Sequence, residues 1–182
     1  MRLTIAAVGR SRESPEQALC ELYCERARVL APKLGFSKVD LVVIDTSRAA
    51  TPDARMKDEA EKLSNKLPAG AHRIALDEAG RTMSSEAFAT HLRRLGDSGA
   101  RDLAFLIGGP DGLALSVRES AAERLAFGPQ TWPHLLVRAM LAEQIYRAFA
   151  ILAGHPYHRG RAPGTLRAPF KYGAAKPPLK AL

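Results

Sequence analysis

An α/β fold with a mainly parallel sheet flanked by helices is predicted by three features of this 182-residue sequence. Short apolar runs alternate along the chain with longer segments whose apolar residues recur at helical spacing. The run Leu103–Ile107 contains no polar residue, which is typical of a strand buried on both faces under helices. With 46% hydrophobic and 25% charged residues, the chain has room for one well-packed domain and little else. No internal repeat is apparent.

Two strand-and-helix pairs are expected in the first half of the chain. Ser14 is placed to cap a helix, because Pro15 follows at the first helical position and Gln17 takes the capping-box position. Thr51-Pro52 opens a second helix, whose Lys and Glu residues are most simply a solvated face. The expected strands are Leu3–Val8 and Val39–Ile44, and the apolar positions of the first helix are Leu19, Leu22, Tyr23 and Leu30.

The second half continues the alternation. Ser84 is expected to cap a third helix, and Ser116 to open a short helix with a capping box. The turn-forming residues Asp77–Gly80 predict that the chain turns after the third strand, and they form a second candidate binding loop. The remaining expected elements are a strand at His72–Leu76, a strand that contains Phe105, an apolar run at Leu125–Phe127, and a long final helix at Leu135–Leu152 with a Glu143–Arg147 pair.

The segment Gly108–Gly112 is a candidate binding loop. Ligands of parallel sheets collect at the carboxyl ends of the strands, and Gly108 and Gly109 allow positive φ and close approach to bare backbone. The segment is neither a P-loop nor a dinucleotide-binding turn, because the residues that define those motifs are missing. The alternative is that the two glycines only make a tight connection.

The charge and composition of the chain indicate which kinds of binding partner it can have. The net charge of +8 and the isoelectric point near 9.9 favour an anionic partner, either nucleic acid or a membrane surface. No apolar run reaches membrane-spanning length, and Met1–Ile5 leads straight into a strand pattern rather than a signal peptide. We therefore expect a cytoplasmic protein that does not bind membranes.

The sequence lacks the catalytic motifs of hydrolases and the ligand motifs of metalloenzymes, and no metal site is expected. Cys20 and Cys24 lie four residues apart on a predicted helix without companion ligands, so core packing is favoured over a disulfide or a metal site. In the tail Gly154–Arg159, zinc binding by His155 and His158 is disfavoured, because Pro156 keeps them off a common helical face. The alternative role for these cationic groups is interaction with the carboxyl end of the final helix.

Four ordered blocks carry a resemblance: Leu106–Gly112, Pro133–Arg138, Glu143–Ala148 and Gly154–Arg159. From residue 1 to about residue 159 the chain resembles the ribosomal RNA large subunit methyltransferase H family, of the SPOUT class. The resemblance implies S-adenosylmethionine-dependent methylation of N3 of a pseudouridine in 23S ribosomal RNA, within the assembled ribosome. It also implies a homodimer with a trefoil-knotted C-terminal region. The alternative is a non-catalytic RNA-binding or ribosome-binding protein that keeps this fold.

The resemblance also implies site residues. Trp132 is expected to contact the cofactor through its backbone, although its side chain could instead plug the core. Neutral His158 could accept the N3 proton, or Arg159 could stabilise the anion after solvent takes it. As a further alternative, both groups could only grip phosphate. The implied cofactor contacts are Leu76, Gly108, Phe127, Gly128, Pro129, Gln130, Thr131 and Trp132, and the implied catalytic residues are Tyr157, His158 and Arg159.

Residues 160–182 extend beyond the resemblance. They include several prolines, five cationic side chains and no acid, so we expect a flexible basic extension after a single domain at residues 1–159. The cationic residues are Arg161, Arg167, Lys171, Lys176 and Lys180.

Overall fold

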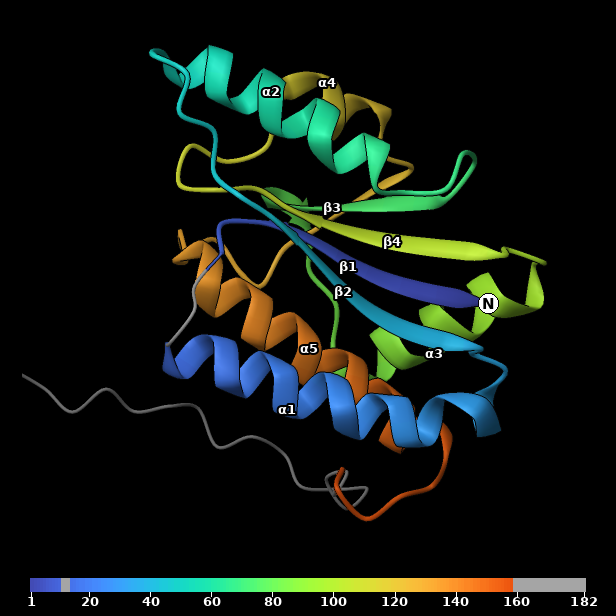
Figure 1. The fold of residues 1–182 in the computed structure, drawn as a ribbon. Helices are drawn as coiled ribbons and strands as arrows, with labels where there is room; N and C mark the ends of the chain where they lie inside the picture. The colour runs from blue at the N-terminus through green and yellow to red at the C-terminus, as the bar shows by residue number, and fades with distance from the viewer. Residues whose placement is uncertain (11–13, 159–182) are drawn as a thin grey trace, which may run out of the picture.

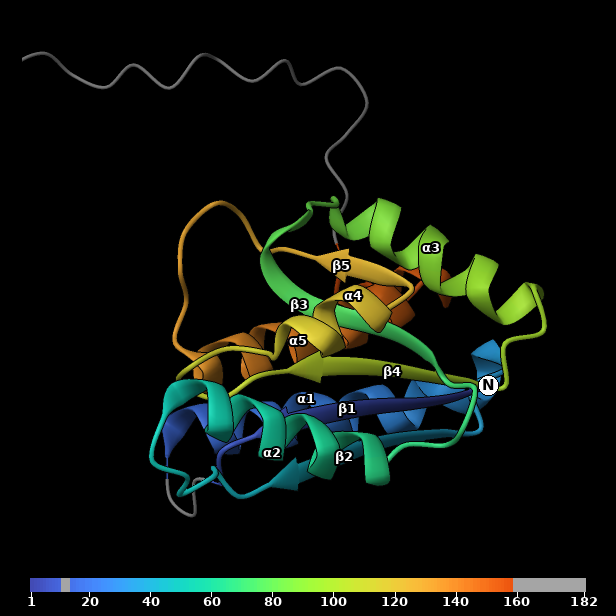
Figure 2. The same ribbon diagram turned by 90° about the horizontal axis from the view of Figure 1, so that it is seen from above.

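Residues 1–10 and 14–158 are described by the computed structural model, and their five strands form one parallel sheet in the order β2-β1-β4-β3-β5. Helices cover both faces of this sheet (Figures 1 and 2), as expected. None of these helices has the length and apolar character to span a membrane. In chain order the elements are β1 (Arg2–Val8), α1 (Pro15–Leu30), the 3-10 helix η1 (Ala31–Leu34), β2 (Lys38–Ile44), α2 (Pro52–Asn65), β3 (His72–Arg81), α3 (Ser85–Asp97), β4 (Asp102–Ile107), α4 (Leu115–Ser120), β5 (Glu123–Leu125) and α5 (His134–Leu152).

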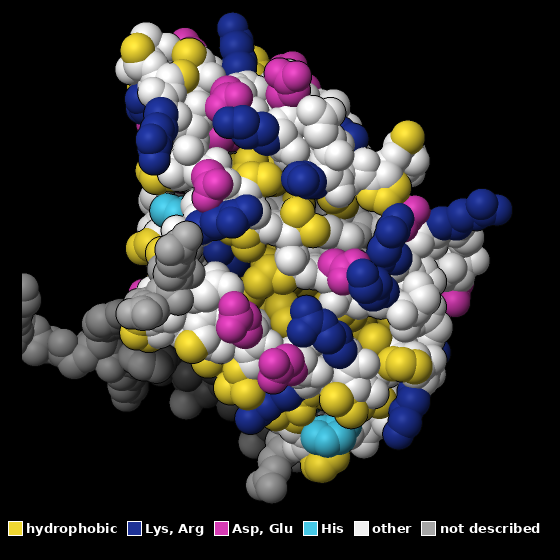
Figure 3. Space-filling model, viewed as in Figure 1, with side chains coloured by type: hydrophobic (Ala, Val, Ile, Leu, Met, Phe, Trp, Pro, Cys, Tyr) yellow, Lys and Arg dark blue, Asp and Glu magenta, His cyan; other side chains and the backbone are white. Residues whose placement is uncertain are grey.

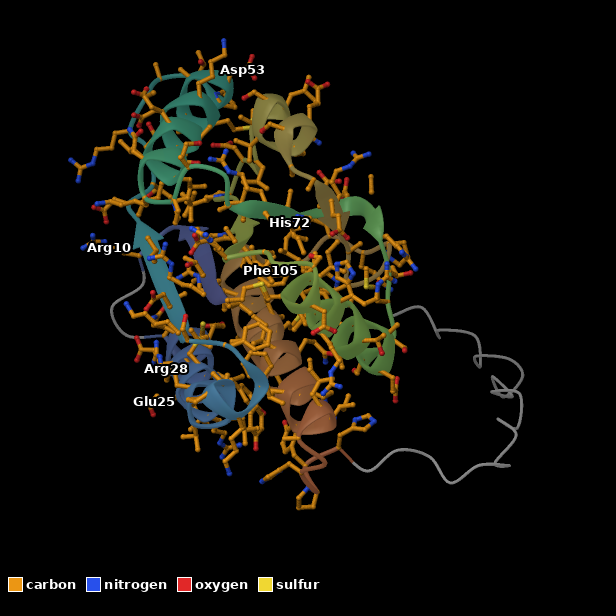
Figure 4. All side chains as sticks on the ribbon, turned by 90° about the vertical axis from the view of Figure 1, so that its right-hand side faces the viewer. Arg10, Glu25, Arg28, Asp53, His72 and Phe105 are labelled. Atoms are coloured by element: carbon orange, nitrogen blue, oxygen red, sulfur yellow. The ribbon has the colours of Figure 1, made fainter. Side chains whose placement is uncertain are left out.

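The two faces of the sheet have separate cores. Successive side chains of a strand point to opposite faces, so Ile5 packs with α1, α3 and α5, whereas Ala6 packs under α2 and α4. Phe105, labelled in Figure 4, is fully buried in the first core, with its ring centroid 5.9 Å from that of Phe88 of α3. This double burial explains why the central strands are apolar throughout.

The three long helices that were expected to carry polar N-caps do so. Ser14, Thr51 and Ser84 each accept a backbone N–H from the residue three positions later, at 3.2 Å in every case. The capping box expected at Ser116 is wrong. Helix α4 begins at Leu115, so Ser116 lies inside it, and its N-cap Ala114 has no side chain that could accept a hydrogen bond.

The turn expected at Asp77–Gly80 is also wrong. Strand β3 continues to Arg81, and both Leu76 and Arg81 pair with Leu125 of β5 across an irregularity in the register. A Cβ atom on Gly80 would lie 2.6 Å from the carbonyl carbon of Leu125. The turn-forming residues therefore make a bulge within a strand, pressed against its neighbour.

Helix α1 buries a different stripe from the expected one. Leu19 and Leu22 are 40% and 41% exposed, whereas Cys20 and Cys24 face the core, which confirms the cysteine prediction. Of the expected apolar positions, Leu30 is buried in the core and Tyr23 packs against it. Small side chains let α1 pack closely along α5. The hydrogen bond with Cys24, together with burial, raises the pKa of Cys20, which keeps this thiol neutral.

Candidate active site

A cavity of about 720 Å³ lies at the carboxyl ends of β3, β4 and β5, beside the start of α5. Three segments far apart in the sequence meet there, as the position of ligands in parallel sheets predicts. Pro129 alone among the eight expected cofactor residues does not line it. The seven that do are Leu76, Gly108, Phe127, Gly128, Gln130, Thr131 and Trp132.

The glycine loop that follows β4 forms one wall of the cavity. Positive φ occurs at Gly112 (85°) rather than at Gly108 or Gly109, which corrects the expectation for those two residues. A Cβ atom on Gly108 would lie 2.3 Å from the carbonyl carbon of Gly112 and 2.6 Å from the backbone nitrogen of Leu113. The loop's own backbone therefore requires glycine at position 108, whatever ligand the cavity takes.

The segment after β5 forms the opposite wall. Gly128 has a φ of 117°, and the Thr131 hydroxyl donates to Glu78 Oε2 at 3.0 Å, which ties this segment to the bulge of β3. Asp77, whose side chain is 7% exposed, contributes a carboxylate that lies 3.3 Å from Arg118 Nη1. Trp132 is 38% exposed and lines the cavity, so its side chain does not plug the core.

Helix α5 supplies two residues beside the cavity that sequence reasoning did not assign. Arg138 is 1% exposed, and its Nη2 donates to the carbonyls of Val8 at 2.9 Å and Gly9 at 2.8 Å. Burial lowers the pKa of Arg138, and burial together with the Arg138 charge lowers the pKa of His134, which lines the cavity. A single arginine inside the apolar run Leu135–Leu141 is the sequence signal that could have identified this contact.

Helix α2 supplies two more, where a solvated face was expected. Arg55 forms a two-pronged ion pair with Asp111 of the glycine loop, with Nε–Oδ2 at 2.7 Å and Nη2–Oδ1 at 3.1 Å. Glu59 is 3% exposed, and its Oε1 accepts the backbone N–H of Ser47 at 2.8 Å. Because they are one helical turn apart, Arg55 and Glu59 share a face that turns inward rather than to solvent.

The tail after α5 lies away from the cavity. Tyr157 donates to Glu143 Oε1 at 3.0 Å, and burial and the contacts with Tyr23 and Glu143 raise its pKa. His158 Nε2 lies 3.0 Å from Glu86 Oε1 of α3, and Arg159 lies outside the described residues.

Neither described tail residue lines the cavity. Helix α5 has 19 residues, which places its two ends about 28 Å apart, and Figure 1 shows it running back along the sheet from the carboxyl ends of the strands. One chain therefore does not bring the expected cofactor residues together with Tyr157 and His158.

Comparison with known proteins identifies the family. A family described as "Predicted SPOUT methyltransferase" matches residues 1–158. The ribosomal RNA large subunit methyltransferases H of Xanthobacter autotrophicus and Hyphomonas neptunium are 51% and 50% identical over 159 residues, which is 87% of this chain and 99% of each relative. A crystal structure of a probable methyltransferase from Bordetella pertussis covers 81% of this chain and 95% of its own, at 18% identity and a TM-score of 0.44. On the strength of its sequence relatives and the family match, the chain belongs to the ribosomal RNA large subunit methyltransferase H family of SPOUT methyltransferases.

Proposed function

We propose that this protein methylates N3 of a pseudouridine in 23S ribosomal RNA of the large subunit, with S-adenosylmethionine as methyl donor. Family membership supports ribosomal RNA methylation. The observation that carries the proposal is the cavity, which gathers seven of the eight residues assigned to the cofactor by resemblance. We place the reaction in the cytoplasm, on assembled ribosomes.

The cavity has the properties that S-adenosylmethionine requires. Its volume of about 720 Å³ suits a nucleoside-sized ligand. Leu76, Leu113 and Trp132 offer apolar surface to an adenine ring, and the glycines at positions 108, 112 and 128 leave backbone groups accessible. When bound, this cofactor supplies a methyl group on a positively charged sulfur, and the carboxylate of Glu78 at the cavity wall favours a cation, whereas the Asp77 carboxylate is already paired with Arg118.

Transfer to a ring nitrogen depends mainly on alignment, and positioning can contribute about 7–11 kcal/mol. The imide proton of N3 must also leave. His158 is one acceptor for this proton, and stabilisation of the resulting anion by Arg159 is the other route. Tyr157 is assigned a supporting role in the tail, because its raised pKa and its hydrogen bond to Glu143 keep its hydroxyl protonated.

The separation of tail and cavity supports a site shared between two chains. We propose a homodimer in which the tail of one chain completes the cavity of the other. A second groove, of about 580 Å³, runs along α5 between α1 and α3 and shares Phe127 and Gly128 with the cavity. Partly exposed apolar side chains line it, which suits a symmetric partner. They are Leu19, Met83, Leu136 and Met140. Ile145 and Phe149, further along the same helix, are buried within their own chain at 1% and 0% exposure and do not contribute to this groove.

Two measurements test the proposed activity. Calorimetry should detect S-adenosylmethionine binding to the pure protein. Incubation of the protein with ribosomes that lack the modification and with radiolabelled cofactor should place one methyl group on N3 of a large-subunit pseudouridine, mapped by mass spectrometry. Cofactor-independent RNA binding without methyl transfer would instead favour the non-catalytic alternative.

Heterodimers test the shared site. One chain carries Leu76→Arg, which fills the cavity with a cation, and the other carries His158→Ala and Arg159→Ala. If tails act across the dimer, one site has both lesions and the other has none, so roughly half the wild-type activity returns. Activity no higher than that of either parent variant would exclude the shared site.

The extension at residues 160–182 is proposed to bind RNA phosphates. On the face shown in Figure 3, Lys and Arg side chains are interspersed with Asp and Glu side chains, whereas the extension has cationic side chains and no acidic ones. Its deletion should weaken RNA binding and leave cofactor affinity unchanged. It should also make the slope of the logarithm of the RNA-binding constant against the logarithm of the salt concentration shallower, by about 0.7–0.9 for each phosphate that the extension neutralises. An unchanged salt slope would rule out an RNA-binding arm.

A further inference from the structure

The glycine loop is held from outside the cavity by a single face of α2. The guanidinium of Arg55 makes its two-pronged contact with Asp111, and Nη1 of Arg55 also donates to the carbonyl of Ala49 at 3.2 Å. One side chain thus joins the tip of the loop to the segment that follows β2. Met56, the next residue of α2, lines the cavity itself.

Glu59 supports the same loop one helical turn later. Its Oε1 is satisfied by the backbone N–H of Ser47, whereas its Oε2 is buried and has no hydrogen-bond partner within residues 1–10 and 14–158. A Cβ atom on Gly109 would lie 3.3 Å from this oxygen and 3.0 Å from Cγ1 of Val8. The backbone at Gly109 is therefore seated directly against Glu59 and β1.

Given the proposed function, we infer that Arg55 is a positioning residue that sets the cofactor affinity by fixing the glycine loop through Asp111, on a backbone that Glu59 supports. The loop supplies the cavity wall from Gly108 to Leu113. Asp111 is the charged residue of this loop, and its carboxylate pairs with Arg55. Both side chains are about three-quarters buried, with 28% (Arg55) and 24% (Asp111) exposed. A two-pronged pair of this kind fixes the relative orientation of the two groups as well as neutralising their charges. Arg55 itself does not line the cavity, so it acts through the loop rather than by touching the cofactor.

The test compares Arg55→Met and Asp111→Asn, each of which removes the two-pronged contact from one side. Calorimetry with S-adenosylmethionine should show a dissociation constant about tenfold higher for each variant. The double variant should bind no more weakly than either single variant, because the effects of substituting two residues of the same contact are not additive. In steady-state assays the KM for the cofactor should rise by a similar factor while kcat changes less. Asp111→Asn leaves α2 intact, so it remains informative if Arg55→Met folds poorly.

A matched ion pair at the other end of the sheet provides the control. Arg2 Nε lies 2.7 Å from Asp102 Oδ1, and both residues begin their strands at the amino ends. Arg2→Met should lower the melting temperature without changing cofactor affinity. Cofactor affinity within twofold of wild type in Arg55→Met and Asp111→Asn would overturn the inference. Absence of cofactor binding to the wild-type protein would instead overturn the proposed function.

Discussion

The two ends of α5 are built differently. At its beginning, Arg138 is buried against the backbone of β1, and the cavity beside it is enclosed by loops of the same chain. At its end, Tyr157 and His158 rest on side chains of α1, α3 and α5, and the Glu86 side chain that contacts His158 is 60% exposed. The difference indicates that loops of one chain enclose the cavity, whereas the tail that carries the proposed catalytic residues lies against the outer side of the helices, away from that cavity.

The largest expected effect is on the rate of methylation. His158→Ala should reduce methyl transfer about 10²–10⁴-fold, the usual range for removal of a proton acceptor, and leave cofactor affinity unchanged. Glu86→Gln is the matched control, because it weakens the contact that holds His158 on its own chain and should preserve activity. Weaker cofactor binding in His158→Ala would contradict the separation of the two ends.

The next effect is on stability. Arg138→Met leaves two buried carbonyls without their donor and should lower the free energy of unfolding by about 3 kcal/mol. Arg147, whose side chain is 28% exposed and paired with Glu143, lies near the other end of α5. Arg147→Met should therefore lower it by less than about 1 kcal/mol. Urea denaturation measures both, and equal losses of stability would contradict the comparison.

Smaller effects on stability are expected from two glycine substitutions, one in the cavity wall beside the start of α5 and one in the tail after its end. Gly108→Ala forces a Cβ atom into the backbone of Gly112 and should destabilise the protein by about 2 kcal/mol while weakening cofactor binding. The glycine pattern alone suggests that a side chain at Gly108 would obstruct only the ligand, and this geometry shows that it would also disturb the fold. Gly154 has a φ of 64° and open space around its Cβ position, so Gly154→Ala should cost about 1 kcal/mol of stability, with normal cofactor affinity. Thermal denaturation and calorimetry together separate these outcomes.

The smallest expected effect is a pH dependence of stability from His134. Because burial and the neighbouring Arg138 hold its pKa below the ordinary value of 6.5, the unfolded chain binds a proton that the folded chain resists. Its contribution to stability is therefore complete above pH 6.5 and declines as the pH falls from there toward the folded pKa. His134→Gln should flatten that part of the pH profile, and an identical profile in the variant would refute the assignment.

Local sequence signals predicted most elements correctly. The N-caps at Ser14, Thr51 and Ser84 occur where expected, because each depends on residues within one helical turn. The bulge at Asp77–Gly80 was mistaken for a turn, because its shape depends on pairing with β5, which lies more than 40 residues later. Glu59 was assigned to solvent for the same reason, because its burial depends on loops that the helical pattern does not contain.

The sequence by itself determined the parallel α/β class and the glycine loop after β4 that forms one wall of the cavity, since ligand sites of such sheets follow directly from where strands end. Only the tertiary structure decided which charged side chains support the loops around that cavity. Arg55 and Asp111 are separated by 56 positions, and Arg138 and Gly9 by 129. Contacts of that range leave no local periodicity, because they arise only when the packed sheet brings strand ends and helix faces together.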